Sequence, residues 1–208
     1  MFDILIFCRR DIKEVIIPPN IKIISSCAFD SCQQLQTMDL SNSFELIQFI
    51  GKSSFSDTSI ENITIPPHVT SIESSSFSGC KRLKTVHIPL NSDLKYIDKE
   101  TFFGSSIESL SIPSKLIEFK EGWCSRTMNL KKIIIQESNP YYIFKDNKFL
   151  LGKTDQKSDI YDILIFCRRS IKEVTYMIFL SFVVEASKKS LFHQILKLFH
   201  HIRLIVVN

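Results

Sequence analysis

The chain has 208 residues and a formal net charge of +4, with 44% hydrophobic residues. This hydrophobic share is ordinary, but the 17 phenylalanines are many and the 5 glycines are few for a chain of this length. The positive charges form no basic stripe with interleaved aromatic residues, so we expect no nucleic-acid partner.

The N-terminal residues lack the features of a secretory signal peptide. The apolar run Met1–Cys8 contains acidic Asp3 where a basic region is expected, and Arg9 and Arg10 follow it. The longest apolar run near the other end, Met177–Val184, is well short of the roughly 20 residues that span a bilayer. These features predict no membrane association, and either a cytoplasmic location or a truncated gene model of a longer surface protein.

The segment Asp3–Val15 recurs as Asp162–Val174, and the two copies differ only where Asp11 is replaced by Ser170. The chain therefore opens in the middle of a unit of the repeat that follows. The end of a repeat array needs a polar cap, and the apolar residues 4–7 do not supply one. We expect an exposed N-terminal end that promotes self-association, or missing upstream repeats.

Between residues 12 and 135 the sequence repeats with a period of 23 to 25 residues, which is typical of a solenoid. Each unit ends in a pattern of the form L-x-x-V-x-I, whose last two anchors lie two residues apart and point to one face of a strand. Proline usually follows, and it ends the strand because it has no N–H to donate. The closing residues are Ile17, Leu40, Ile65, Ile88, Ile112 and Ile135.

A second pattern lies upstream in each unit, where an apolar residue precedes an aromatic residue by five positions. Stacked unit on unit, such large residues form a continuous buried ladder, because no single unit buries this face alone. In the fifth unit Cys124 stands five positions after Phe119, with Trp123 beside it. The pairs in the first four units are Ile24/Phe29, Ile50/Phe55, Ile72/Phe77 and Ile97/Phe102.

Small residues follow the ladder phenylalanine at fixed distances. Gly79 and Gly104 stand two positions after it, where we expect a positive φ. The residues three positions after it suit the inside of a tight turn, and they are Cys32, Thr58, Cys80 and Ser105. No C-x-x-C pair indicates zinc. Free cysteine is among the most buried residue types, which predicts buried, reduced thiols at Cys27, Cys32, Cys80 and Cys124.

The combined pattern, A/S-F-x-G-C-x-x-L-x-x-V-x-I-P, resembles the BspA-like leucine-rich repeat family, also called the Treponema-type repeat, over residues 12–176. The resemblance implies an α/β or mainly β repeat solenoid, a right-handed stack of about five turns with a parallel sheet on one face. Members of the family are often surface proteins of anaerobic bacteria and mucosal protozoa that are associated with adhesion. The resemblance therefore implies a cell-surface location.

The period breaks after Ile135, and residues 141–151 read as strand, turn and strand. A further strand is expected at Ile163–Phe166, and the pattern Ile171-x-x-Val174-x-Tyr176 then restores the repeat anchors. In the resembled family a similar hairpin separates blocks of repeats. We therefore expect repeats at residues 1–135, a hairpin insert with the start of the next repeat at 136–176, and a C-terminal tail at 177–208.

The tail has two interpretations. The first is a helical cap that begins at Ser190 and places apolar residues along one face. The second is a reading-frame slip near residue 175, because the genetic code permits in the shifted frame a pattern that matches residues 77–92. We favour the second, which leaves a poorly packed or disordered appendage. Basic residues such as Lys188 and Lys189 favour an anionic membrane surface, although chance composition explains them equally well.

No arrangement of residues indicates catalysis. His87 occupies an outward strand position with no acidic or thiol companion, and the sequence has no glycine-rich phosphate-binding or dinucleotide-binding motif. His193, His200 and His201 would meet on one face of a helical tail, because seven or eight residues make two turns, and metal binding there is a minor alternative. We expect a protein that is not an enzyme and that has no cofactor and no metal.

An extended repeat surface binds partners by default, so we predict binding at the outward positions of the strands. The partner would be a protein or a host-surface ligand, in keeping with adhesion in the resembled family. The alternative is a truncated gene-fragment remnant with no binding role. The candidate residues are Gln36, Thr37, Asp39, Glu61, Asn62, Thr64, Lys84, Thr85, His87, Glu108, Ser109, Ser111, Lys131 and Lys132.

Overall fold

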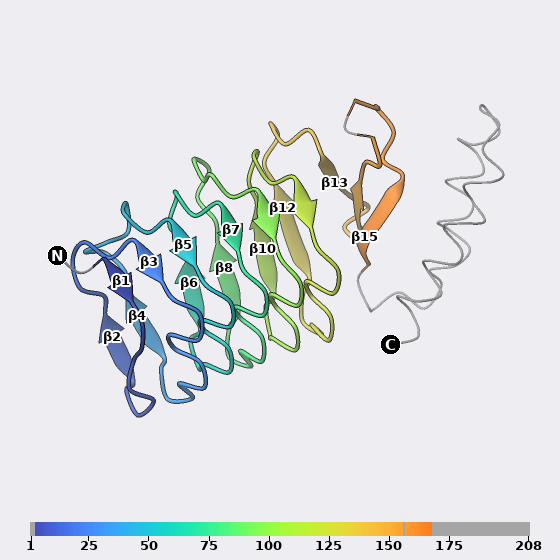
Figure 1. Ribbon diagram of the computed structural model, residues 1–208. Coiled ribbons are helices and arrows are strands. Elements are labelled where there is room, and N and C mark those ends of the chain that lie inside the picture. The colour runs from blue at the N-terminus through green and yellow to red at the C-terminus, as the bar shows by residue number, and fades with distance from the viewer. Residues whose placement is uncertain (1–2, 156, 168–208) are drawn as a thin grey trace. The chain divides into compact units, whose positions relative to one another are not determined.

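The computed structural model describes residues 3–155 and 157–167, in which all helical or strand structure is β-strand. The polypeptide winds in successive coils, and each coil contributes the L-x-x-V-x-I segment to one side of the stack (Figure 1). These strands form two parallel sheets, β2–β4 and β6–β8–β10–β12. The strands are β2 (Glu14–Ile16), β4 (Thr37–Asp39), β6 (Asn62–Thr64), β8 (Thr85–His87), β10 (Ser109–Ile112) and β12 (Lys132–Ile135).

A six-stranded parallel sheet lies on another side of the coils, at the apolar residue that precedes each ladder aromatic. The sequence predicted strands on one face only, because two-residue strands are too short to show the alternation by which strands are recognised. The sheet also shows six coils where about five were predicted, since residues 3–17 form a coil of their own. Its strands are β1 (Ile4–Leu5), β3 (Ile23–Ile24), β5 (Phe49–Ile50), β7 (Ser71–Ile72), β9 (Tyr96–Ile97) and β11 (Glu118–Phe119).

The predicted ladder of phenylalanines is confirmed. Phe29, Phe55, Phe77 and Phe102 are each 0% exposed and stack along the solenoid with centroid separations of 5.2, 5.2 and 5.6 Å. The planes of neighbouring rings differ by only 9° to 13°. Offset stacking at these distances stabilises aromatic pairs beyond the burial of their area. Four successive coils therefore each contribute one ring to a continuous column in the interior.

The turn around each ladder ring is tight. Residues two positions before and after the ring have positive φ, among them Gly79 (φ 69°) and Gly104 (φ 63°), as predicted. Inside the turn, a small side chain donates to a carbonyl of the preceding coil: Cys80 Sγ lies 3.0 Å from Phe55 O, and Thr127 Oγ1 lies 3.0 Å from Phe102 O. These carbonyls also accept a backbone N–H, so the small donors add a side-chain hydrogen bond between neighbouring coils.

Trp123 ends the stack. Its carbonyl accepts the Phe102 N–H at 2.7 Å, so Trp123 occupies the position just before the ladder ring, and the backbone places Cys124 at the ladder position itself. The indole lies edge-on to Phe102, with centroids 6.4 Å apart and planes at 82°, and it also contacts Phe119 at 4.5 Å. Earlier coils carry small residues at this point, namely Ala28, Ser54, Ser76 and Thr101.

The predicted hairpin insert forms a three-stranded antiparallel sheet in the order β13 (Tyr142–Lys145), β14 (Phe149–Gly152) and β15 (Ile163–Cys167). Two consecutive residues of positive φ, Asp146 and Asn147, turn the chain between β13 and β14, and the Lys148 N–H closes the turn by donating to the Lys145 carbonyl at 3.0 Å. Tyr142 is buried and its hydroxyl donates to the Ile117 carbonyl at 2.6 Å. The hairpin thus continues the hydrophobic core beyond the last coil.

The remaining sequence predictions fall outside the described residues. These are the repeat anchors at 171–176, the tail at 177–208 with its cap, membrane-surface and reading-frame interpretations, and the histidines at 193, 200 and 201. In the part of the chain that the structure describes, no helix suited to crossing a bilayer is found.

Candidate interaction face

We name the outer side of β4, β6, β8, β10 and β12 the strand face. Along each strand the side chains alternate, because successive residues of a strand point to opposite sides. The inward residues Ile63, Val86, Leu110 and Ile133 are at most 7% exposed, whereas the polar residues on either side of each are exposed or half-buried. The structure therefore places the predicted binding residues on the solvent side of the sheet.

Parallel pairing aligns the predicted residues in rows across the strands. One row runs through Asn62, Thr85, Ser109 and Lys132, which are Cα partners in the sheet. A second row begins with Thr64 opposite His87, and Ser111 lies opposite the exposed Ile134 at its far end. Neighbouring members of a row lie about 4.8 Å apart, the spacing of paired strands.

A third row lies where the strands begin. The backbone N–H of Lys84 donates to Glu61 O, that of Glu108 to Lys84 O, and that of Lys131 to Glu108 O, at 2.8 to 2.9 Å. The side chains of this row thus alternate in charge along the solenoid, acid then base. Opposite charges on adjacent coils attract one another weakly at an exposed surface, and like charges would repel.

Three of the predicted residues, Gln36, Thr37 and Asp39, belong to the separate sheet β2–β4. Between β4 and β6 the described residues form no strand pair, so the strand face is interrupted there. Ser59 bridges the two coils instead by donating to Gln33 O at 2.6 Å. The structure therefore brings the candidates on β6 to β12 together in one sheet and leaves those on β4 beside it.

A polar pocket that the sequence did not predict opens next to this interruption. Its volume is about 340 Å³, and Arg82 on its wall contacts the carboxylate of Glu61 on the strand face. Asp57 packs against Gly79, where an added Cβ would lie 2.0 Å from the Asp57 Oδ1. The residues that line the pocket are Gln33, Asp57, Thr58, Ser59, Gly79, Lys81 and Arg82.

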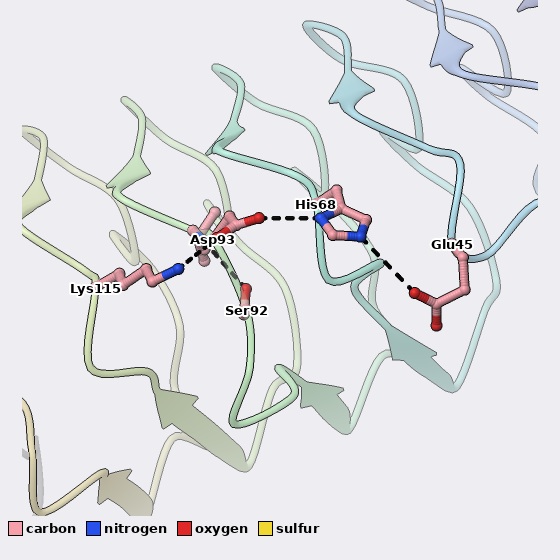
Figure 2. A network of polar contacts seen from close by, with 6 residues as sticks. Glu45, His68, Ser92, Asp93 and Lys115 are labelled. Carbon is pink, nitrogen blue, oxygen red and sulfur yellow. Dashed lines mark hydrogen bonds and ion pairs between the residues drawn. The ribbon is translucent and has the colours of Figure 1, made fainter.

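Sequence reasoning also missed a chain of charges that crosses four coils (Figure 2). His68 lies between two carboxylates, with Nδ1 3.0 Å from Asp93 Oδ2 and Nε2 3.8 Å from Glu45 Oε2. Lys115 Nζ lies 2.6 Å from Asp93 Oδ1. The signal was present as opposite charges 22 to 25 residues apart, close to one repeat period, but it becomes recognisable only when coils are aligned.

This chain of charges favours a structural role over catalysis. Lys115 and then His68 hold the pKa of the Asp93 carboxyl below its ordinary value through hydrogen bonds. The imidazole of His68 has a carboxylate near each nitrogen, so neither nitrogen faces a hydroxyl or thiol that it could activate. Within residues 3–155 and 157–167, no group of three or more potential ligands suited to a metal ion is found.

The cysteines differ from the prediction in part. Cys32 and Cys80 are buried and free, and burial raises the pKa of the Cys80 thiol to about 11, so it stays protonated. Cys124 is half-buried. The prediction was wrong for Cys27, which is exposed, because it lies two positions before the ladder ring at a positive φ of 58° and its side chain leaves the turn.

Comparison with solved structures shows the same fold in bacterial proteins. The pneumococcal vaccine antigen PcpA is 23% identical over 68% of this chain and 34% of its own, with a TM-score of 0.59. A leucine rich cell surface protein from Faecalibacterium prausnitzii A2-165 is 24% identical over 68% of this chain and 43% of its own, with a TM-score of 0.52. The chain thus spans less than half the length of either protein.

No curated protein sequence matches the chain. A family model described as BspA type leucine rich repeat region matches residues 5–131 in six copies. The six copies agree with the six coils of the solenoid, and the match covers more than half of the chain. The chain therefore belongs to the BspA type leucine-rich repeat family.

Proposed function

We propose that the chain is a non-catalytic scaffold that binds a protein partner through the strand face. One observation carries this proposal: mostly polar side chains stand in registered rows over four paired strands, β6, β8, β10 and β12. β8 and β10 each pair on both edges, so their backbone N–H and C=O groups are used within the sheet and recognition there falls to the side chains. A rigid and extended array of this kind is the surface that solenoid proteins use for binding.

The charges of the strand face indicate the chemistry of the partner. Glu61, Lys84, Glu108 and Lys131 alternate in sign, so the face has no single-sign field that would attract a polyanion. Complementary charges steer association and set the register of a complex more than they raise its affinity. The partner expected from this pattern is a folded protein surface with alternating charges of its own.

Cell-surface display with an adhesive role is the finer part of the proposal. It is supported by family membership and by the names of the similar structures, one a vaccine antigen and the other a cell surface protein. The chain spans only part of those proteins, so their activities apply to this chain as a proposal.

The test is adhesion of beads coated with the full chain to cultured mucosal epithelial cells. The double variant Lys84→Glu/Thr85→Glu changes two exposed neighbouring residues of the strand face. A matched variant, Thr70→Glu/Lys95→Glu, makes the same change of charge at two exposed residues on neighbouring coils near β7 and β9, away from the strand face. Reversal of charge at a recognition surface weakens association by about tenfold or more.

We expect the strand-face variant to lose adhesion and the matched variant to keep it. Equal loss in both variants would show that net charge and not the strand face governs adhesion. If beads coated with the original chain or with either variant adhere no better than uncoated beads, the result would favour the alternative of a gene fragment with no binding role. Circular dichroism of each variant verifies that the β-solenoid is retained.

A further inference from the structure

One stretch of sequence occurs twice in this chain and takes part in two kinds of sheet. Residues 3–10 and 162–169 are identical, D-I-L-I-F-C-R-R. In the first copy β1 lies parallel on β3, with Ile4 opposite Ile23 and Leu5 opposite Ile24. In the second copy β15 lies antiparallel on β14 at the other end of the solenoid. The structure thus shows the same peptide with two different strand partners.

The second copy presents an open edge. β15 is the last strand of the sheet β13–β14–β15, and within the described residues it pairs with β14 alone. The free edge of a strand is a template for another strand, because its backbone N–H and C=O groups seek partners. The sequence on this edge is the one that β3 accepts in the first coil.

The first copy contacts β3 over a short stretch. It forms a strand of only two residues, and beyond them Ile6 and Phe7 are 71% and 64% exposed. Its backbone bonds to the second coil include Ser25 N–H to Leu5 O at 2.9 Å, and Leu5 packs against the core. A strand of identical sequence from another molecule would form the same contacts with β3 that β1 forms, at the additional cost of the entropy of association.

The second copy is arranged to make such contacts without leaving its own hairpin. Ile165 and Phe166 pack against the core of their own molecule, and Phe166 lies 6.2 Å from Trp123. The pairing of β15 with β14 is irregular here, because Leu164 lies opposite Leu151 and Phe166 lies opposite Leu150. Leu150 and Leu151 are successive residues and point to opposite sides of the sheet, so Leu164 points away from the side on which Phe166 packs. Leu164 is the counterpart of Leu5, and it is half-buried. Its side chain is therefore available to a second solenoid.

We propose that the chain associates head to tail, with β15 of one copy seated on β3 of the next copy in place of that copy's β1. The partner is a second copy of this chain, because a strand of the same sequence, β1, already pairs with this edge of β3. The contact joins two different surfaces, and such heterologous contacts form open, extended assemblies unless they close into a ring.

The test uses one substitution at two positions that have identical sequence surroundings. Leu5→Asp weakens the pairing of β1 and so exposes the edge of β3, while β15 stays intact. Leu164→Asp weakens β15, while β1 stays paired with β3. The full chain, both single variants and the double variant are compared by sedimentation velocity over a range of protein concentrations.

A charge opposes burial at either position. We expect Leu5→Asp, which releases β1 from β3, to associate at a concentration at least about tenfold lower than the original chain does. We expect Leu164→Asp, which weakens β15, to associate less than the original chain. The double variant is expected to be monomeric. Non-specific aggregation of a damaged N-terminal coil would persist in the double variant, which would overturn the proposal. Association of Leu164→Asp at the level of the original chain would also overturn it.

The register is tested by cross-linking in a chain that carries Cys27→Ser, since Cys27 is the exposed native thiol. Ile4 and Ile23 are Cα partners within one molecule, so Ile163 of a second copy would take the place of Ile4. Oxidation of a mixture of Ile23→Cys and Ile163→Cys chains is expected to give a disulfide-linked dimer. A control mixture with Ile16→Cys in place of Ile163→Cys should give none, because Ile16 is exposed and lies outside the duplicated strand. Equal cross-linking in both mixtures would refute the register.

Discussion

Phe77→Ala removes the central ring of the stack on which neighbouring coils meet. The Phe77 ring is 0% exposed, with Phe55 at 5.2 Å on one side and Phe102 at 5.6 Å on the other. Truncation of a buried phenylalanine to alanine costs about 3–5 kcal/mol through lost burial and the cavity that remains. Loss of two stacked pairs places this variant near the upper end, at ~5 kcal/mol.

Two comparisons separate stacking from burial. Phe29 is equally buried but has one stacked phenylalanine neighbour, at 5.2 Å, so Phe29→Ala should cost ~1 kcal/mol less than Phe77→Ala. Phe49 lies on β5 with 40% of its side chain exposed, and Phe49→Ala should cost less than ~1 kcal/mol. The three variants therefore have a predicted order that follows ring contacts and exposure.

The assay is urea unfolding of the full chain, followed by far-ultraviolet circular dichroism and by tryptophan fluorescence. Trp123 is the single tryptophan and lies at the end of the stack, against Phe102. Each coil contacts only its neighbours, so a gap in the middle uncouples the two halves, and the two signals should change at different urea concentrations in Phe77→Ala. A destabilisation by Phe77→Ala no greater than that by Phe49→Ala would refute the role of the stack.

Two further predictions concern a turn and the chain of charges. Gly79→Ala should destabilise the fold by ~2 kcal/mol or more, because φ is 69° and the new Cβ would meet Asp57. Gly104→Ala should cost ~1 kcal/mol, because φ is 63° but the space around the new Cβ is open. Equal losses of stability in urea unfolding would contradict this difference. The pKa of the Asp93 carboxyl is lowered in the folded state, chiefly by Lys115. The ionised carboxylate therefore stabilises the fold at pH values above the ordinary aspartate pKa of about 3.9, and this stabilisation is lost as the pH falls through the lower pKa of the folded state. The difference in urea midpoint between the original chain and Asp93→Asn should therefore shrink on acidification, and an unchanged difference would speak against the ion pair.

The sequence by itself determined the coil and its interior. The spacing of 23 to 25 residues brings Phe55 over Phe29 and Val86 over Ile63, because every coil must place its apolar residues against the same residues of its neighbour. Burial of a repeated pattern needs no information from outside the repeat. The alternation of inward and outward residues then followed from strand geometry, which is why the candidate strand face was predictable residue by residue.

Only the tertiary structure decided what lies between coils. The sheet through β1 to β11 is made of two-residue strands, and their pairing exists only in the backbone bonds from one coil to the next. The interruption of the strand face beside β4, the charges around His68 and the outward turn of Cys27 are likewise settled by how coils stack. The duplicated segment gives the clearest case, since one sequence forms β1 in one place and β15 in another. A strand takes its partner from the backbone groups that its surroundings offer, and a local sequence does not contain its surroundings.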